Sequence, residues 1–411
     1  MAIRTIFTGI AHSPRMVVLT VLVVVGLLAA GFESWAVRRH LGRRTVPGGG
    51  DLPPVSILKP LCGLDSELAA NLESFYRLDY PRYELLFGVA SADDPALPVA
   101  MAVAEAHPEV PSRVIVDGRT VGLNPKVNNL ANLERHAAYD LLLISDSNVR
   151  VPTGYLTELV ALLHQPGVGL VSSPVVAEGG ATLGARLEGL QLNTFVLGGV
   201  TAMHRLGGVC VMGKSMLLRR ATLAELGGFR FLGRFLAEDQ VCGQEVARRG
   251  HAIALASLPV RNVMGPLSVR QFLARHLRWA RIRRHVAPLG FLGEALLTPV
   301  VLAALGLVLE PSATTAALLG TAVLAKATFE LLSERAAGVH RSPLAYLFLS
   351  VVKEMLVGLA WFVPWGSSHV RWRGNSLRIG RRTELRPVVA APRLGEGTVG
   401  VAEADLEPAR G

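Results

Sequence analysis

The sequence predicts an α/β domain held between membrane helices at its two ends. Half of the 411 residues are hydrophobic and the mean hydropathy is +0.39, a high value for a water-soluble protein. An uncharged run lies at residues 16–32, and three apolar blocks lie between residues 287 and 365. Between them, short apolar strands alternate with helical segments, which is typical of an α/β domain.

The net charge of the chain limits the classes of partner that it can bind. The net charge is +10 and the isoelectric point is near 10.1, values compatible with nucleic acid, an anionic membrane or phosphate-bearing substrates. The basic residues gather beside the apolar segments, which favours a membrane and argues against nucleic acid. Three widely spaced cysteines, Cys62, Cys210 and Cys242, indicate neither a disulfide framework nor a zinc site.

Residues 1–35 are expected to anchor the chain in the membrane. The run from Met16 to Phe32 is long enough to cross the hydrocarbon layer as a helix. A signal peptide is the alternative, but the run exceeds a usual signal core and is followed by Glu33 and four arginines. These arginines place the following domain in the cytoplasm, which for a bacterial protein means the inner membrane. Residues 36–54, basic and then rich in Gly and Pro, form a linker.

Residues 55–267 contain the predicted α/β domain. The segments "VSILKPL", "YELLFGVAS", "LLLIS" and "GVCVMGKSMLLRR" are expected as strands in this order. Helices are expected after Asp65 or Ser66, after "NPKVNN", after a cap at Thr153, and across "AEDQVCGQEVARRGH", with Gly250 at the C-terminal end.

The C-terminal third is expected to be membrane-associated. Residues 268–286 contain six arginines and an apolar face at helical spacing, so they predict a basic amphipathic helix. The blocks 287–309, 313–332 and 343–365 are each nearly long enough to span. Three full spans would place the basic tail, 366–411, outside the cell. Because an arginine-rich tail should stay in the cytoplasm, one block is expected to be re-entrant or to lie in the interface.

Two predicted strands end in acidic residues. Asp93 and Asp94 close one, and Asp146, followed by Ser147 and Asn148, closes another. Such acids are often only turn or cap residues, but two in one sheet favour a ligand site at the carboxyl ends of the strands. Asp146 and Asn148 can offer hard oxygen ligands to Mg²⁺ or Mn²⁺, with substrate phosphates completing the coordination.

Two later segments carry further candidates. Glu238 and Asp239 are either an ordinary first helical turn or the location of a general base. The arginine-rich helix suits anionic headgroups, and its Arg275 and Arg278 can also clamp phosphate while Trp279 packs over a sugar or an acceptor.

Together these motifs resemble the signature of membrane-bound glycosyltransferases of the GT-A (Rossmann-like) fold. The signature appears as "SADDPA", "SDSNV", "AEDQ" and "RHLRW", with Arg275 in the first place of (Q/R)xxRW. The chain is most similar to the ceramide glucosyltransferases of glycosyltransferase family 21, which are related to family 2. Supporting stretches are "SILKPLCGLD", "NLESFYRLDYPRYELLFGV", "GLNPKVNNL" and the "WRG" of Trp372 to Gly374, so the resemblance covers most of residues 55–380.

The resemblance implies a role for each matched residue. Asp94 and Lys126 would serve the nucleotide, and Asp146 the metal and diphosphate. Asn148 stands where the usual DxD motif has a second acid, which puts the identity and strictness of the metal, Mn²⁺ or Mg²⁺, in doubt. Asp239 would be the catalytic base, while Arg275, Arg278 and Trp279 would secure the sugar-donor diphosphate and the acceptor mouth.

The activity implied is an inverting transfer of a sugar, with glucose expected, from a UDP-sugar to the hydroxyl group of ceramide. A hopanoid glycosyltransferase that uses UDP-N-acetylglucosamine is the nearest alternative. A processive polysaccharide synthase would need more spanning helices than this chain offers. A non-catalytic membrane-binding module would leave the three acidic segments unexplained.

Overall fold

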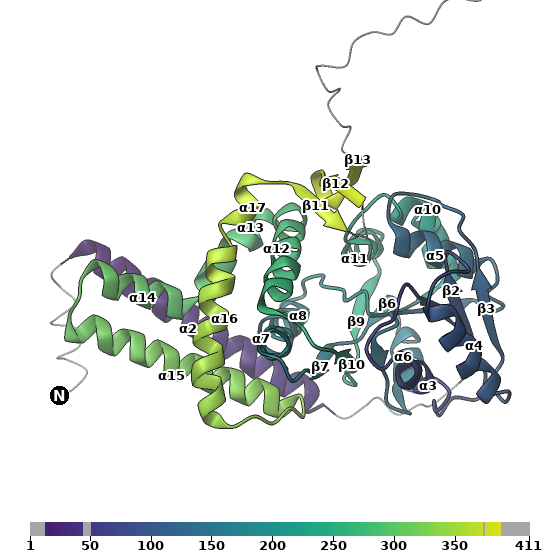
Figure 1. The fold of residues 1–411 in the computed structure, drawn as a ribbon, viewed down its shortest axis with the longest axis horizontal. Helices are drawn as coiled ribbons and strands as arrows, with labels where there is room; N and C mark the ends of the chain where they lie inside the picture. The colour runs from purple at the N-terminus through teal and green to yellow at the C-terminus, as the bar shows by residue number, and fades with distance from the viewer. Residues whose placement is uncertain (1–12, 44–50, 373–374, 388–411) are drawn as a thin grey trace, which may run out of the picture.

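The computed structural model describes residues 13–43, 51–372 and 375–387. An α/β unit lies beside a long bundle of apolar helices, to which both ends of the chain contribute (Figure 1). The predicted class, an α/β domain with membrane helices on both sides of it in the sequence, is therefore confirmed. Part of the expected linker, Arg373 and Gly374 of "WRG", and the tail beyond residue 387 lie outside the described residues.

The main sheet has seven strands in the order β3-β2-β1-β4-β8-β6-β9. Neighbours are parallel except at β8, which is antiparallel to both β4 and β6. The strands are β1 (Val55–Pro60), β2 (Tyr83–Val89), β3 (Ser112–Val116), β4 (Leu141–Ser145), β6 (Val168–Ser172), β8 (Ser215–Arg219) and β9 (Ala252–Leu255). The carboxyl ends of β1, β2 and β4 therefore meet at one edge.

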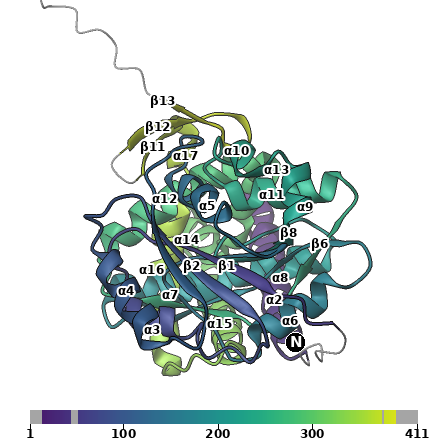
Figure 2. The ribbon, with the colours of Figure 1, turned by 90° about the vertical axis from the view of Figure 1, so that its right-hand side faces the viewer.

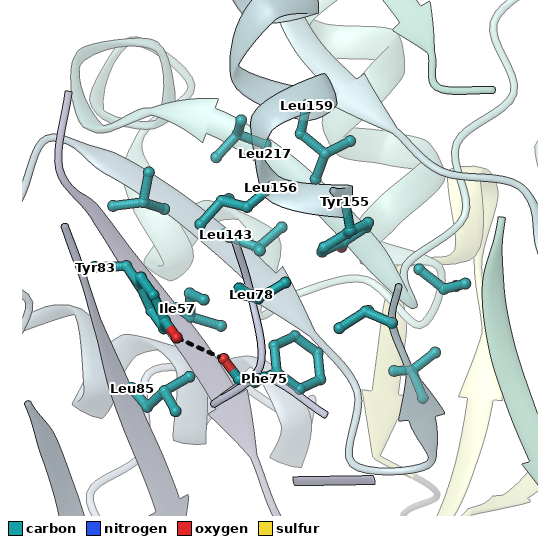
Figure 3. Packing of buried hydrophobic residues seen from close by; sticks show 14 of the residues in the cluster. Ile57, Phe75, Leu78, Tyr83, Leu85, Leu143, Tyr155, Leu156, Leu159 and Leu217 are labelled. Carbon is teal, nitrogen blue, oxygen red and sulfur yellow. Dashed lines mark hydrogen bonds between the residues drawn. The ribbon is translucent and has the colours of Figure 1, made fainter. Parts of the chain in front are cut away.

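Helices cover both faces of this sheet, which explains why its parallel strands are largely apolar. The first face packs against α3 (Leu68–Glu73), α4 (Ala96–Ala106) and α6 (Tyr155–Leu163), and the second against α5 (Pro125–Glu134), α9 (Arg220–Glu225), α10 (Gly228–Leu232) and α11 (Glu238–Arg248). Figure 3 shows the first core, in which Leu156 and Leu159 lie over Ile57 and Leu143. Figure 2 views the molecule from the side of the α/β unit.

Two predicted helix caps are wrong. The N-cap of α6 is Gly154 rather than Thr153, whose carbonyl oxygen instead accepts a hydrogen bond from the amide of Asp79. Helix α3 starts after Glu67 without a side-chain cap. Asp65 is unavailable as a cap because its carboxylate accepts a hydrogen bond from Ser147, which is distant in sequence.

One small sheet and four helical segments connect the α/β unit to the membrane part. One sheet contains β5 (Val149–Arg150), β10 (Val260–Met264) and β7 (Val175–Gly179). A continuous helical path runs through α7 (Leu183–Gln191), η1 (Leu192–Val196) and α8 (Leu197–Arg205). Helix α12 (Val269–Val286) starts with a capping box between Ser268 and Gln271 and matches the expected amphipathic segment.

Three helical segments among the described residues are long and apolar enough to cross a membrane. They are α2 (Pro14–Leu41), α15 (Ala313–Ala336), and α16 (Pro343–Ala360) together with α17 (Val363–Gly366). These segments identify the chain as a membrane protein. Helix α2 continues six residues past the expected end of the anchor, so the linker begins later than expected.

The first C-terminal block is broken. Helix α13 (Pro288–Gly293) and η2 (Glu294–Leu297) are bent by 62° relative to α14 (Pro299–Leu309). Helices α2, α14 and α15 pack together through small and branched side chains, among them Val23, Ala303 and Ala322, while α16 runs across the bundle (Figure 1).

The residues after the last helix do not form a simple tail. They fold into a sheet of β11 (His369–Trp372), β12 (Asn375–Ile379) and β13 (Leu385–Pro387). The amide of Leu236 donates to the carbonyl oxygen of Thr383 at 3.0 Å, and Arg382 pairs with Glu245 of α11 at 2.6 Å. The described part of the tail therefore lies on the same side of the bundle as the α/β unit.

Candidate functional site

The site lies at the carboxyl edge of the main sheet, where Asp146 follows β4. Lys126, in the first turn of α5, places its Nζ atom 2.8 Å from Asp146 Oδ1. Lys214, just before β8, places its Nζ atom 3.4 Å from Asp146 Oδ2 and donates to Asn148 Oδ1 at 2.7 Å. Asp146 and Asn148 are thus joined by one ammonium group, and a second ammonium group holds the other carboxylate oxygen.

The acidic pair at the start of α11 belongs to the same cluster. Lys126 Nζ lies 3.1 Å from Glu238 Oε1 and donates to the carbonyl oxygen of Gly213 at 3.0 Å. The Asp239 carboxylate accepts from the amide of Gly213 at 2.7 Å and from the amide of Gln240 at 2.8 Å. The structure therefore brings four of the predicted residues to one place, namely Lys126, Asp146, Asn148 and Asp239.

The two aspartates have opposite pKa shifts. Burial by itself would raise the pKa of Asp146, but the charges of Lys126 and Lys214 outweigh burial and lower it to about 2. Burial raises the pKa of Asp239 to about 6, with a further increase from neighbouring Glu238 and an opposing effect of Lys126. Asp146 is therefore ionised at neutral pH, whereas Asp239 titrates near the physiological range, as a general base should.

A third lysine, Lys59 of β1, holds the backbone of Asp146. It is fully buried, donates to the backbone oxygen of Asp146 at 2.8 Å and to Ser145 Oγ at 3.3 Å, and lies 3.7 Å from the centre of the Phe75 ring. Burial lowers its pKa to about 7. Lys59 and Lys214 were not among the residues predicted from the sequence, although a lysine inside the apolar run "SILKPL" was a usable signal.

Asp94 reaches the cluster only indirectly. Its Oδ1 atom accepts from the amides of Gly63 and Ala96, each at 2.9 Å. Gly63 belongs to the loop after β1 that also carries Asp65, which accepts a hydrogen bond from Ser147. The loop thus connects the two strand ends that carry Asp94 and Asp146.

Helix α12 approaches from the membrane side. Arg275 and His276 share the buried carboxylate of Glu188 on α7, at 3.0 and 2.8 Å respectively. The Trp279 ring meets the His276 ring edge-on at 5.3 Å between centroids, and Arg278, partly buried, lies one turn beyond Arg275. Burial lowers the pKa of Lys214, the charge of Asp146 opposes this effect, and the charges of Lys126 and Arg275 add to it. Glu188 was not among the residues predicted from the sequence.

A narrow cavity lies beneath α12, between it and the membrane helices. Phe195, His276 and Trp361 line it, together with the charged side chains of Glu294 and Lys326. Lys326 pairs with Glu354 at 3.1 Å, and Lys353 pairs with Glu330, so these buried charges are compensated. The cavity offers both apolar and polar groups at the level where α12 meets the bundle.

The oxygen ligands expected for Mg²⁺ or Mn²⁺ do not fit a metal ion in this arrangement. Both carboxylate oxygens of Asp146 and the amide oxygen of Asn148 already face lysine ammonium groups. Across the described part of the chain, no group of three His, Cys, Asp or Glu side chains is placed to hold a metal.

One family model matches most of the chain. A family model described as "Glycosyl transferase family 21" matches residues 18–385. "Ceramide glucosyltransferase 3" and "Ceramide glucosyltransferase 1" of Caenorhabditis elegans are each 32% identical to the chain, over 65% and 58% of it. "Ceramide glucosyltransferase" of Komagataella phaffii is 29% identical over 64% of it. The matches span 57%, 51% and 63% of these relatives' own lengths.

One similar solved structure is the "Mannosyltransferase PcManGT from Pyrobaculum calidifontis in complex with GDP-Man and Mn2+". It is 20% identical to the chain, with a TM-score of 0.47, and the match covers 84% of this chain and 98% of that one.

Proposed function

The chain belongs to glycosyltransferase family 21, and from this premise we propose that it is an inverting glycosyltransferase that transfers a sugar from a UDP-sugar to a membrane lipid. Ceramide is the proposed acceptor and glucose the proposed sugar, because the relatives named above are ceramide glucosyltransferases. The α/β unit, as a GT-A domain, would bind the sugar donor at the carboxyl edge of its sheet.

The observation that carries the proposal is a difference among the acids at that edge. Two of them are paired with lysines, whereas the third, Asp239, is held by backbone amides. Asp146 is fixed between two lysines, and Glu238 is paired with Lys126 and accepts from Asn124 at 3.1 Å. Asp239, in contrast, is held by two backbone amides and has a raised pKa. Of these three acids, Asp239 is best suited to take a proton from an acceptor hydroxyl.

Transfer then follows as a direct displacement at the anomeric carbon. Asp239 removes the proton as the lipid oxygen attacks, and the UDP diphosphate leaves toward the lysines and Arg275. A single base without a carboxylate nucleophile gives inversion of an α-linked donor to a β-linked product. Arg278 and Trp279 are proposed to complete the diphosphate and acceptor contacts, and Asp94, fixed by two amides, to contact the nucleoside.

The acceptor is proposed to arrive from the bilayer. The cavity beneath α12 lies between the basic helix and the apolar bundle, so a lipid head group can approach the site while its chains stay in the membrane. The α/β unit is proposed to face the cytoplasm, because the arginines that follow the apolar part of α2 are on its side. The expected Mn²⁺ or Mg²⁺ enters no step here, because the residues around Asp146 do not fit it.

The test is a transfer assay with the full chain purified in detergent. UDP-glucose, UDP-galactose and UDP-N-acetylglucosamine are each offered with ceramide or a polyol hopanoid, and the lipid products are identified by mass spectrometry. A hexosyl ceramide from UDP-glucose supports the proposal. Transfer of N-acetylglucosamine to the hopanoid alone would instead assign the alternative acceptor. The Asp239→Asn variant should lower kcat by roughly 10²–10⁴-fold in the productive combination.

A further inference from the structure

Lysine is rare in this chain and is confined to its interior. Only five of the 42 basic residues are lysines, and none has a side chain more than 18% exposed. Lys326 and Lys353 neutralise buried glutamates in the bundle, and Lys59, Lys126 and Lys214 surround Asp146. Exposed positions carry arginine instead, for example Arg77 with 59% exposure. The three lysines of the site are therefore not part of an ordinary solvated surface.

The position of Lys214 is the one that a metal would be expected to take. Its Nζ atom lies between Asp146 Oδ2, at 3.4 Å, and Asn148 Oδ1, at 2.7 Å. A divalent ion bound by the same two oxygens would have to share this partly buried space with an ammonium group of like charge, which is strongly unfavourable.

The amide at position 148 suits an ammonium group better than a metal. A second carboxylate would give the pair two negative charges, which favours a divalent ion. With Asn148 the pair carries one negative charge, contributed by Asp146, and the ammonium groups of Lys126 and Lys214 already face it. The usual DxD motif has a second acid where this chain has Asn148, and the ammonium group of Lys214 lies beside this amide.

Lys214 also has an N–H donor available for a ligand. An ammonium group has three N–H donors, and Asp146 and Asn148 account for two of those of Lys214. Lys126 has partners for all three of its donors, namely Asp146, Glu238 and the Gly213 carbonyl oxygen. Lys214 is therefore suited to contact a ligand, and Lys126 to hold Asp146 in place.

We propose that the Lys214 ammonium group, held by Asp146 and Asn148, binds the diphosphate of the sugar donor directly and takes the place of a divalent cation. The proposal rests on the proposed function, since it requires a nucleoside diphosphate at this edge of the sheet. UDP binding should then be independent of metal.

The test measures UDP binding to the full chain in detergent by isothermal titration calorimetry, in EDTA and in excess Mn²⁺ or Mg²⁺. The wild-type Kd should be the same in each condition. Lys214→Ala should weaken binding about tenfold to a hundredfold in EDTA, the loss expected for a charge-assisted contact. Arg77→Ala, which removes an equal charge from an exposed position, should bind as the wild type does.

A double variant tests the replacement itself. Lys214→Ala combined with Asn148→Asp creates a pair of acids without the ammonium group, so UDP binding should now require Mn²⁺ or Mg²⁺. Wild-type binding that disappears in EDTA and returns with either metal overturns the lysine proposal and leaves the glycosyltransferase assignment standing. Absence of UDP binding in every condition contradicts the proposed function as well.

Discussion

At the residue scale, the environment of Asp239 separates it from the other acids of the site. Its carboxylate is buried beside Glu238 and accepts two backbone hydrogen bonds, whereas Asp146 is neutralised by lysines. The two carboxyl groups therefore differ in pKa because burial and the neighbouring Glu238 raise that of Asp239, whereas the charges of two lysines outweigh the burial of Asp146. This difference allows one aspartate to act as a base while the other remains a fixed charge.

The raised pKa of Asp239 predicts how the rate depends on pH. Below about pH 6 the carboxyl group is protonated and cannot accept a proton, so kcat should rise with pH through about 6 and then level off. The measurement is kcat between pH 5 and 8, with the melting temperature followed over the same range to exclude unfolding. A rate that is flat between pH 5 and 7 would contradict the assignment of Asp239 as the base.

A substitution at Gly213 gives a second prediction at the residue scale, concerning kcat. A Cβ atom there would lie 2.7 Å from Asp239 Oδ2, so Gly213→Ala should displace the carboxylate and reduce kcat by roughly a hundredfold or more. Gly154→Ala is the matched control, because a Cβ at that position meets no atom within 4 Å. Equal activities of the two variants, measured in the same transfer assay, would show that the position of Asp239 is not critical.

At the scale of elements, α12 is fixed to α7 by one buried carboxylate. Glu188 is fully buried and holds both Arg275 and His276, so it sets where the RxxRW motif lies relative to the main sheet. The amphipathic pattern of α12 predicts the face that packs, but not the partner that fixes its position along the sheet.

Removing that carboxylate should destabilise the protein. Glu188→Ala leaves His276 and Arg275 without their shared partner and is expected to cost about 3 kcal/mol, seen as a lower melting temperature in detergent. Glu73→Ala is the control, because its exposed pair with Arg77 spans 3.9 Å and should contribute little. If both variants melt as the wild type does, Glu188 does not anchor the helix.

At the scale of the whole molecule, the arrangement of the helices explains why the C-terminal sheet lies beside the α/β unit. Helices α2, α14 and α15 lie lengthwise in the bundle, and α16 runs across it although it is long and apolar enough to span (Figure 1). We expect α2, α15, and α14 together with the bent segment before it to cross the membrane. These crossings return the chain to the side of the α/β unit, where the small C-terminal sheet contacts α11. We therefore expect α16 to lie in the interface region rather than to cross the membrane.

This arrangement predicts that Cys62 and the end of β13 face the same compartment. Cys62 is exposed, so a variant with Cys210 and Cys242 replaced by alanine should react with a membrane-impermeant maleimide in inside-out vesicles and not in intact cells. Arg386→Cys in a background without other cysteines should give the same result. Labelling of the two cysteines from opposite sides would show that α16 crosses the membrane.

The sequence by itself determined which segments are buried and which side chains are candidates for the site. Hydrophobic runs and periodicity are local properties, so the α/β class, the helix α12 and the apolar segments could be predicted from them. The acids at strand ends were visible for the same reason, since strand ends can be read directly. Family motifs added the candidate roles of Asp94, Lys126, Asp146, Asp239 and the residues of α12.

The tertiary structure alone decided which charged side chains meet. Lys59, Lys214 and Glu188 act through partners between 60 and 90 residues away along the chain. Such pairing depends on strand order and on which ends share an edge, and neither is encoded in a local pattern. The same reason explains why only the structure showed that the block 287–309 is bent, and that Asn148 faces an ammonium group where a metal had been expected.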